Sequence, residues 1–272
     1  MVLRRAAAAG QYRGVDPASD LPAVARVLAA AGCVAADEEA AELVAAAAGD
    51  AGVLRALVDR RVTGEPLAWI TGRTVFCGLE VAVDPGVYVP RWQSEPLARR
   101  AADHLPDTGV AVDLCCGAGA IGLVLREARP GAEVVGTEVD PVAARCARRN
   151  GLSVLVGDLD DPLPELLAGR VDVLVGVLPY VPAGAMATLP RDVRDFEPRL
   201  ALDGGENGLE VVARAVRRSP RWLRPGGWLL LEVGSDQVDG ASALLMAAGF
   251  GDPEVIEDGD GDPRAVSARF AG

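Results

Sequence analysis

The sequence predicts an α/β protein of 272 residues in three parts: a small helical bundle at residues 1–66, a β-hairpin linker at 67–90 and a sheet domain at 91–272. Three observations support this prediction. Apolar residues recur at helical spacing in the first part, and they alternate with other residues in the second. In the third part, short apolar runs alternate with helix-length segments, which is typical of a parallel sheet with crossover helices. Half of all residues are hydrophobic, enough to bury a full core.

The first part contains three short amphipathic segments between Leu21 and Val62. The first ends near Gly32, a residue type that commonly stops a helix. The second is expected to be capped by Asp37, and the third follows directly. Ala-rich segments of this length predict a small bundle packed on itself, and their faces also suit a protein partner.

The second part has the alternation of a β-hairpin around Cys77 and Gly78. The turn at 84–86 then leads towards an expected helix start at 93–95. The alternating apolar residues are Val75, Phe76, Leu79, Val81 and Val83.

The third part is expected to contain seven strands separated by helices and turns. Residues 223–228, LRPGGW, predict a turn before the fifth strand because Pro and Gly interrupt regular structure. Residues 258–270 predict a closing hairpin. The strands are expected near residues 110, 134, 154, 172, 228, 254 and 265.

The segment VAVDLCCGAGAIGLV at 110–124 is central to this sheet. It consists of an apolar run that ends in an acid, a loop of small residues and a helix-compatible run, so it predicts a strand, a tight turn and a helix. Gly117 and Gly119 allow the backbone to approach a ligand, and Cys115 is expected to pack against that ligand.

Acidic residues stand at the ends of the first three expected strands. Glu138 lies about 20 residues after the loop, where a carboxylate accepts both ribose hydroxyls of a nucleotide. Asp158 is expected to accept a hydrogen bond from an adenine amino group of the ligand. Asp113 is expected to steady the loop or to bind the amino group of a methionine moiety in the ligand. No phosphate-binding Lys or Arg is expected near the loop, which favours an adenosyl ligand without a pyrophosphate: S-adenosylmethionine (SAM).

Charge and composition exclude several classes of function. The net charge of −12 and the lack of a basic stripe disfavour nucleic-acid binding. All 27 basic residues are Arg, so Lys-based Schiff-base chemistry is excluded. The single histidine, His104, is expected on the surface. The five cysteines have no C-x-x-C spacing, so neither a metal centre nor a disulfide framework is expected. No run is apolar enough for a signal peptide or a membrane span, and a cytoplasmic location is expected.

Several motifs taken together resemble the class I SAM-dependent methyltransferases, and more narrowly the HemK/PrmC group, which methylates the glutamine side-chain nitrogen of peptide-chain release factors. The motifs are DLCCGAGAIGL at 113–123, GDL at 157–159, LPYVP at 178–182, the segment 64–91, FEPRLALDGGENGLEV at 196–211 and LEVGSDQ at 231–237.

The resemblance implies a seven-stranded Rossmann-like sheet, SAM or S-adenosylhomocysteine as the bound cofactor, and N-terminal helices that help to bind a protein substrate. It adds Leu159 and Val177 to the expected cofactor contacts. Arg91 and Glu95 match the pattern of the group, whereas residues 92–94 depart from its usual Pro, Glu and Thr.

One motif of the group is altered. Its fourth strand ends in Asn-Pro-Pro-Tyr, where the Asn oxygen and a Pro carbonyl accept the two amide N–H bonds and so orient a poor nucleophile. Here the motif is Val177-Leu178-Pro179-Tyr180, and Val177 has no acceptor. Loss of one positioned partner in a desolvated site costs about 10²–10³ in rate. Glutamine methylation is therefore not expected.

Three explanations stay open. The substrate is a better nucleophile on a small metabolite; or methyl transfer is lost and the protein catalyses an elimination or an intramolecular ring closure, for example to an aziridine, in natural-product biosynthesis; or the chain is a non-catalytic SAM-binding scaffold. The altered motif favours a small-molecule substrate over a release factor.

The candidate catalytic residues are Tyr180, Pro179, Glu197 and Arg91. Tyr180 is expected to pack on the substrate or to donate a hydrogen bond. Arg91, with Tyr88, Gln93 and Ser94 nearby in sequence, is expected to bind an anionic or polar substrate. Glu197 is either a supporting or base residue, or a salt-bridge partner of an Arg. Any base must be a carboxylate, because the chain has no Lys.

Overall fold

The fold was obtained as a computed structural model that describes residues 21–272. Predictions for residues 1–20, the start of the expected bundle, lie outside this range. The chain divides into two compact units between Thr71 and Gly72. The expected linker at 67–90 is therefore not one element: residues 67–71 form a helix in the first unit, and the hairpin belongs to the second.

The first unit consists of helices α1 (Leu21–Ala30), α2 (Ala36–Ala46), α3 (Ala51–Val62) and α4 (Leu67–Thr71). Asp37 does not cap α2: it lies in the first turn, and the N-cap is Ala35 without a side-chain hydrogen bond. Asp50 caps α3 by accepting from two backbone amides at 2.7 and 3.0 Å. The shared core contains Leu28, Leu43, Leu54, Val58 and Ile70.

The second unit opens with the predicted hairpin of β1 (Arg73–Phe76) and β2 (Leu79–Ala82). Cys77 and Gly78 have φ angles of 51° and 81°. Two consecutive left-handed residues suit the twist of a two-residue hairpin turn. The Cys77 amide donates to Glu95 Oε1 at 2.8 Å, which joins the turn to the start of the next helix.

The seven predicted strands are confirmed and form one sheet in the order β5-β4-β3-β6-β7-β9-β8. All pairs are parallel except β7–β9 and β8–β9. The chain order reverses between β3 and β6, and ligands of open α/β sheets bind at such a point beyond the carboxyl ends of the strands. The strands are β3 (Val110–Leu114), β4 (Glu133–Glu138), β5 (Ser153–Val156), β6 (Val171–Gly176), β7 (Leu223–Glu232), β8 (Glu254–Glu257) and β9 (Pro263–Arg269).

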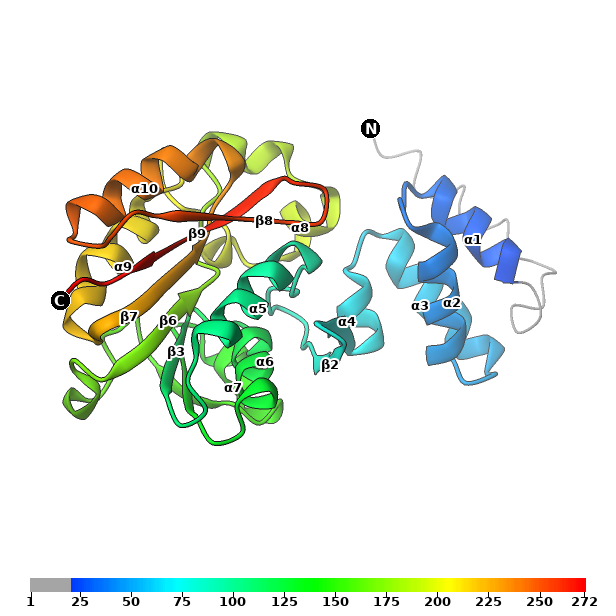
Figure 1. Cartoon of the computed structure of the whole chain (residues 1–272). Coiled ribbons are helices and arrows are strands. Elements are labelled where there is room, and N and C mark those ends of the chain that lie inside the picture. Colours follow the sequence, from blue (N-terminus) through cyan, green and yellow to red (C-terminus); the bar gives the residue numbers. More distant parts are fainter. Residues whose placement is uncertain (1–20) are drawn as a thin grey trace. The chain divides into compact units, whose positions relative to one another are not determined.

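Helices cover both faces of the sheet (Figure 1). One face carries Val110, Val112 and Leu114, which share a core with residues of α9 and α10. The other face is covered by α5, α6 and α7, and there the Gly122 amide of α6 donates to Asp113 Oδ2 of β3 at 2.9 Å. The helices are α5 (Glu95–His104), α6 (Ala120–Ala128), α7 (Pro141–Arg149), α8 (Arg191–Phe196), α9 (Glu210–Arg218) and α10 (Val238–Ala247).

Two local predictions were wrong. Residues 223–228 do not precede the fifth strand as a turn: β7 starts at Leu223, and the irregularity appears as a register shift against β6. His104 is not simply a surface residue, because its ring stacks on Trp228 with centroids 3.8 Å apart and its Nε2 is buried. Burial lowers the pKa of His104.

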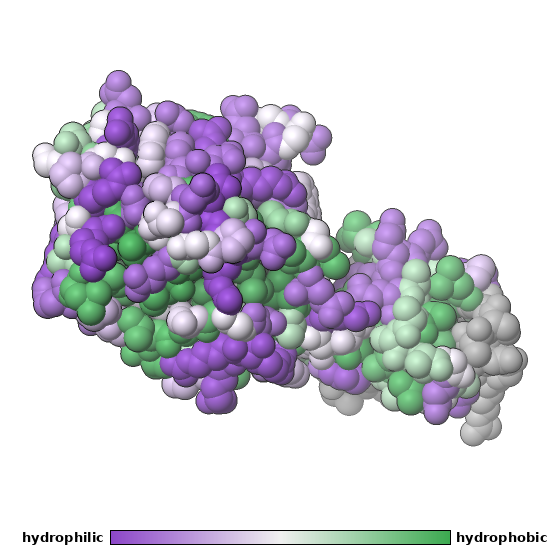
Figure 2. Space-filling model, turned by 60° about the horizontal axis from the view of Figure 1, so that its bottom comes forward, coloured by the Kyte–Doolittle hydropathy of each residue, from purple (hydrophilic) through white to green (hydrophobic). Residues whose placement is uncertain are grey.

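Hydrophilic side chains dominate the surface shown in Figure 2, with hydrophobic areas between them. Such interspersed apolar areas are ordinary for a folded protein. Within residues 21–272, none of the helices has the length and apolar character needed to span a membrane.

Candidate active site

A cavity lies at the carboxyl ends of β3, β4 and β6, where the strand order reverses. The loops after these strands form one wall, and the segment before α5 and the segment after α8 form the others. Eight of the twelve predicted site residues line it: Asp113, Cys115, Gly117, Glu138, Asp158, Val177, Arg91 and Pro179.

Four predicted site residues are not among the lining residues. Gly119 is the N-cap of α6 with φ 82°, and a Cβ there would lie 3.1 Å from the Ala147 Cβ, so this glycine allows the helices to pack closely. Leu159 is 2% exposed and belongs to the core on the α9 face. Tyr180 and Glu197 lie next to lining residues and bind other protein groups, described below.

The loop after β3 places open space at Gly117 beside a fixed carboxylate. Gly117 has φ 55°, and a Cβ added there would meet nothing within 4 Å, so its position faces open space. Glu138 accepts from the amides of Gly117 and Asp140, at 2.9 Å each, through different carboxylate oxygens. These bonds fix the carboxylate and leave each oxygen a second lone pair for a hydroxyl. Burial raises the pKa of Glu138 against the opposing effect of the amides.

The cavity is electrostatically suited to a cation. Asp113 is 1% exposed, and burial raises its pKa to about 7, with a smaller contribution from the charge of Glu138. The lining contains five carboxylates and only two guanidinium groups. A sulfonium or ammonium group bound here would offset the desolvation of these acids.

Cys115 has a structural role in this loop. It adopts φ 54°, and burial raises its pKa well above the usual range, as do nearby acids. A thiol in such a setting stays protonated and unreactive. It therefore contributes shape and polarizable contact rather than nucleophilic chemistry.

The tip of β6 presents hydrocarbon to the cavity, since Val177 lines it with no hydrogen-bonding side chain. Tyr180, which does not line the cavity, donates through its hydroxyl to Glu232 Oε1 at 3.0 Å. Glu232 ends β7 and is 3% exposed. Burial raises its pKa, and the hydroxyls of Ser94 and Tyr180 oppose that rise. Glu232 was not predicted from the sequence, although the available signal was an acid at the end of an apolar run, in LEVG.

Arg91, which lines the cavity, forms an ion pair with Glu197, which does not. The Arg91 guanidinium lies 5.3 Å from the centre of the Tyr88 ring. Glu197 has a side chain 1% exposed, and burial raises its pKa to about 7 although Arg91 opposes the rise. The salt-bridge alternative for Glu197 is thus the one found. Tyr88 and Ser94 line the cavity and Gln93 does not.

Two further lining residues were missed. Asp203 follows α8, and the Arg199 guanidinium holds its pKa below the usual range. Arg214 comes from α9 and pairs with Asp158. No local signal reveals this arginine in the cavity lining, because 56 residues separate the partners. Among residues 21–272 no cluster of His, Cys, Asp or Glu is arranged to hold a metal ion.

A seven-stranded sheet with this order, a glycine loop after β3 and a fixed acid at the end of β4 define a class I SAM-dependent methyltransferase. Comparison with known proteins narrows the class. Residues 79–156 match the family model described as Methyltransferase small domain. A release factor glutamine methyltransferase of Geobacter sulfurreducens is 36% identical over 222 residues, covering 79% of this chain and 77% of that protein. The chain therefore belongs to the HemK/PrmC family.

The chain is also similar to two other methyltransferases. The 4-amino-L-phenylalanine/4-methylamino-L-phenylalanine methyltransferase of Streptomyces pristinaespiralis is 39% identical over 203 residues, covering 71% of this chain and 69% of that protein. A solved methyltransferase structure from Pyrococcus furiosus has a TM-score of 0.50 and 20% identity, and it covers 72% of this chain and 90% of that one. The latter likeness shows the fold alone.

Proposed function

We propose that this protein transfers the methyl group of SAM to an amine nitrogen of a small substrate rather than to the glutamine of a release factor. The observation that carries the proposal is Val177, which lines the cavity after β6. The family motif has at this position an Asn that accepts a hydrogen bond from the substrate amide. A HemK/PrmC relative named for two small amino-acid amines supports a substrate of this kind in the family.

The nature of the nucleophile explains why Asn is dispensable. The nitrogen of an amide delocalises its lone pair into the carbonyl, so it needs acceptors that localise the pair and stabilise charge. A neutral amine already has a localised pair and needs only orientation towards the methyl carbon. Val177 supplies an apolar contact for the body of such a substrate.

When bound, SAM supplies an electrophilic methyl group whose C–S bond breaks as the N–C bond forms, and the electron pair passes to sulfur. The chain contributes charge and position. Asp203 stays ionised beside Arg199 and faces the cavity, so it can accept an N–H of the substrate. The methylated amine releases one proton to water, because Glu197 is paired with Arg91 and does not line the cavity. Tyr88 and Arg91 also line the cavity and can contact the substrate.

The test uses the full-length protein and methyl-labelled SAM. One arm offers a bacterial release factor, and a control arm offers the same factor with its acceptor glutamine replaced by alanine. Another arm offers a panel of small aromatic and aliphatic amines, including 4-amino-phenylalanine. We expect label in an amine and none in either release factor.

Two outcomes would contradict the proposal. Efficient labelling of the release-factor glutamine would show that Val177 does not prevent amide methylation. Consumption of a small substrate while SAM stays intact would show a reaction other than methyl transfer. A Val177→Asn variant serves as a positive control for the release-factor arm, since it restores the missing acceptor.

A further inference from the structure

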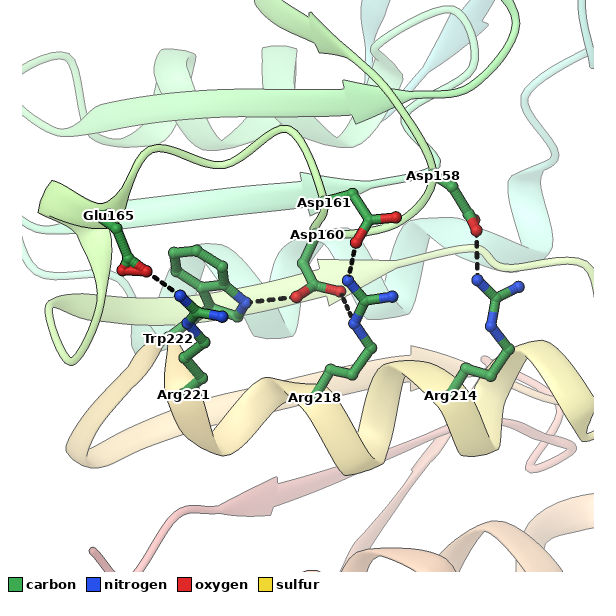
Figure 3. Close-up of polar contacts among 8 residues, drawn as sticks. All are labelled: Asp158, Asp160, Asp161, Glu165, Arg214, Arg218, Arg221 and Trp222. Carbon is green, nitrogen blue, oxygen red and sulfur yellow. Dashed lines mark hydrogen bonds and ion pairs between the residues drawn. The ribbon is translucent and has the colours of Figure 1, made fainter.

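A ladder of ion pairs joins α9 to the segment that follows β5 (Figure 3). The three arginines of the ladder are spaced by four and three residues, so they project from one side of α9 and its short continuation at Ser219–Arg221. The opposite side of α9 is apolar and packs into the core. The pairs are Arg214 with Asp158, Arg218 with Asp160 and Asp161, and Arg221 with Glu165.

The middle pair is structural. The Asp160 side chain is 7% exposed; its Oδ1 lies 2.6 Å from Arg218 Nε, and its Oδ2 accepts from Trp222 Nε1 at 2.7 Å. Trp222 is itself 3% exposed. Both oxygens of a buried carboxylate are thus engaged, which fixes α9 against the loop.

The pair of Arg214 and Asp158 differs from the others because both residues line the cofactor cavity. Their side chains are 41% and 47% exposed, and ion pairs this open add little to stability. Arg214 contacts Asp158 Oδ2 alone. Within the described part of the chain, Asp158 Oδ1 has no hydrogen-bond partner.

We propose that Arg214 is a positioning residue for cofactor recognition. By holding Oδ2, it fixes the rotamer of Asp158 and leaves Oδ1 free to accept the adenine amino group. A carboxylate held in one orientation loses less conformational freedom when the ligand binds, so the hydrogen bond contributes more to affinity. Arg214 therefore increases the ratio of affinities in favour of a purine that carries a 6-amino group, although it does not contact that group.

The test measures binding of two ligands by calorimetry. One is S-adenosylhomocysteine, and the other is its analogue with hydrogen in place of the 6-amino group. We expect the wild type to prefer the first by about tenfold, as one charge-assisted hydrogen bond allows, and Asp158→Ala to lose the preference. Arg214→Met keeps the apolar stem and the Asp158 carboxylate, and we expect its preference to fall to about threefold or less.

Arg218→Ala is the matched control, because it removes an ion pair one turn further along α9 that does not line the cavity. It should lower the melting temperature and keep the wild-type preference. Arg214→Lys should restore part of the preference. In the Asp158→Ala background, Arg214→Met should cause no further change in the ratio.

Three results would overturn the proposal. They are a wild type without preference, an Arg214→Met variant with the full preference, and an equal effect of Arg214→Met with and without Asp158. The first would remove the contact between Asp158 and adenine, and the others would remove the role of Arg214.

Discussion

At the scale of single residues, three carboxylates that line the cavity are held by different partners. Glu138 is fixed by two amides, Asp158 by a guanidinium and Asp113 by one amide in full burial. All three were predicted from sequence because each follows an apolar run of strand length. Arg214 and Asp203 were not predicted, since they line the cavity from segments that are distant in sequence from the loop after β3. Spacing identifies the end of a strand, but it does not identify what packs across from it.

The raised pKa of Asp113 predicts that SAM binding depends on pH. Asp113 is protonated below about pH 7 in the free protein, and a bound sulfonium favours its ionised form. SAM affinity should therefore fall as pH decreases below 7 and level off above it. Asp113→Asn keeps an acceptor for the Gly122 amide, and we expect weaker SAM binding with a flatter pH profile. Calorimetry from pH 5.5 to 8.5 checks this. S-adenosylhomocysteine, which lacks the sulfonium charge, should vary less, and an identical profile for both ligands would contradict the explanation.

At the scale of elements, the strands were predicted better than the short helices between them. Apolar runs located all seven strands, and the Cys77–Gly78 turn located the hairpin. Helix α4 was assigned to the linker because five residues are too few to show helical periodicity. The start of β7 was missed because Pro225 and two glycines indicate a turn, whereas pairing with β6 keeps the segment in the sheet through a register shift.

Asn150 connects the hairpin to the loop after β3, and its hydrogen bonds yield a prediction about stability. Its Oδ1 accepts from the Ala82 amide at 3.0 Å, and its Nδ2 donates to the carbonyls of Ala82 and Ala118 at 2.8 and 2.9 Å. Asn150→Ala removes all three bonds, so we expect a loss of about 1–3 kcal/mol in the free energy of unfolding, measured in urea. SAM affinity should also fall, because Ala118 lines the cavity. Arg149→Ala, which breaks only an exposed pair with Asp84, should cost less than about 1 kcal/mol. Equal losses in both variants would contradict this assignment.

At the scale of the whole molecule, the alternation of strands and helices was enough to predict an α/β sheet, and the family motifs were enough to predict its seven strands and its cofactor. The substrate was not predictable in this way. Val177 indicates which nucleophile is disfavoured, while the cavity residues that we propose for the substrate come from two distant segments: Tyr88 and Arg91 precede α5, and Asp203 follows α8. Their combination exists only in the folded chain.

The two units have separate hydrophobic cores, and this predicts how the molecule melts. The cofactor cavity is formed by residues of the second unit. A ligand that binds only the folded state stabilises it by ~2.7 kcal/mol at 100 times its Kd. In scanning calorimetry we therefore expect S-adenosylhomocysteine to raise the melting temperature of a transition that belongs to the second unit. A second, smaller transition from the helical unit should stay in place, because its core is small and remote in sequence from the ligand residues. A single transition that shifts as a whole would show that the units unfold together, and Glu138→Ala should abolish the shift in either case.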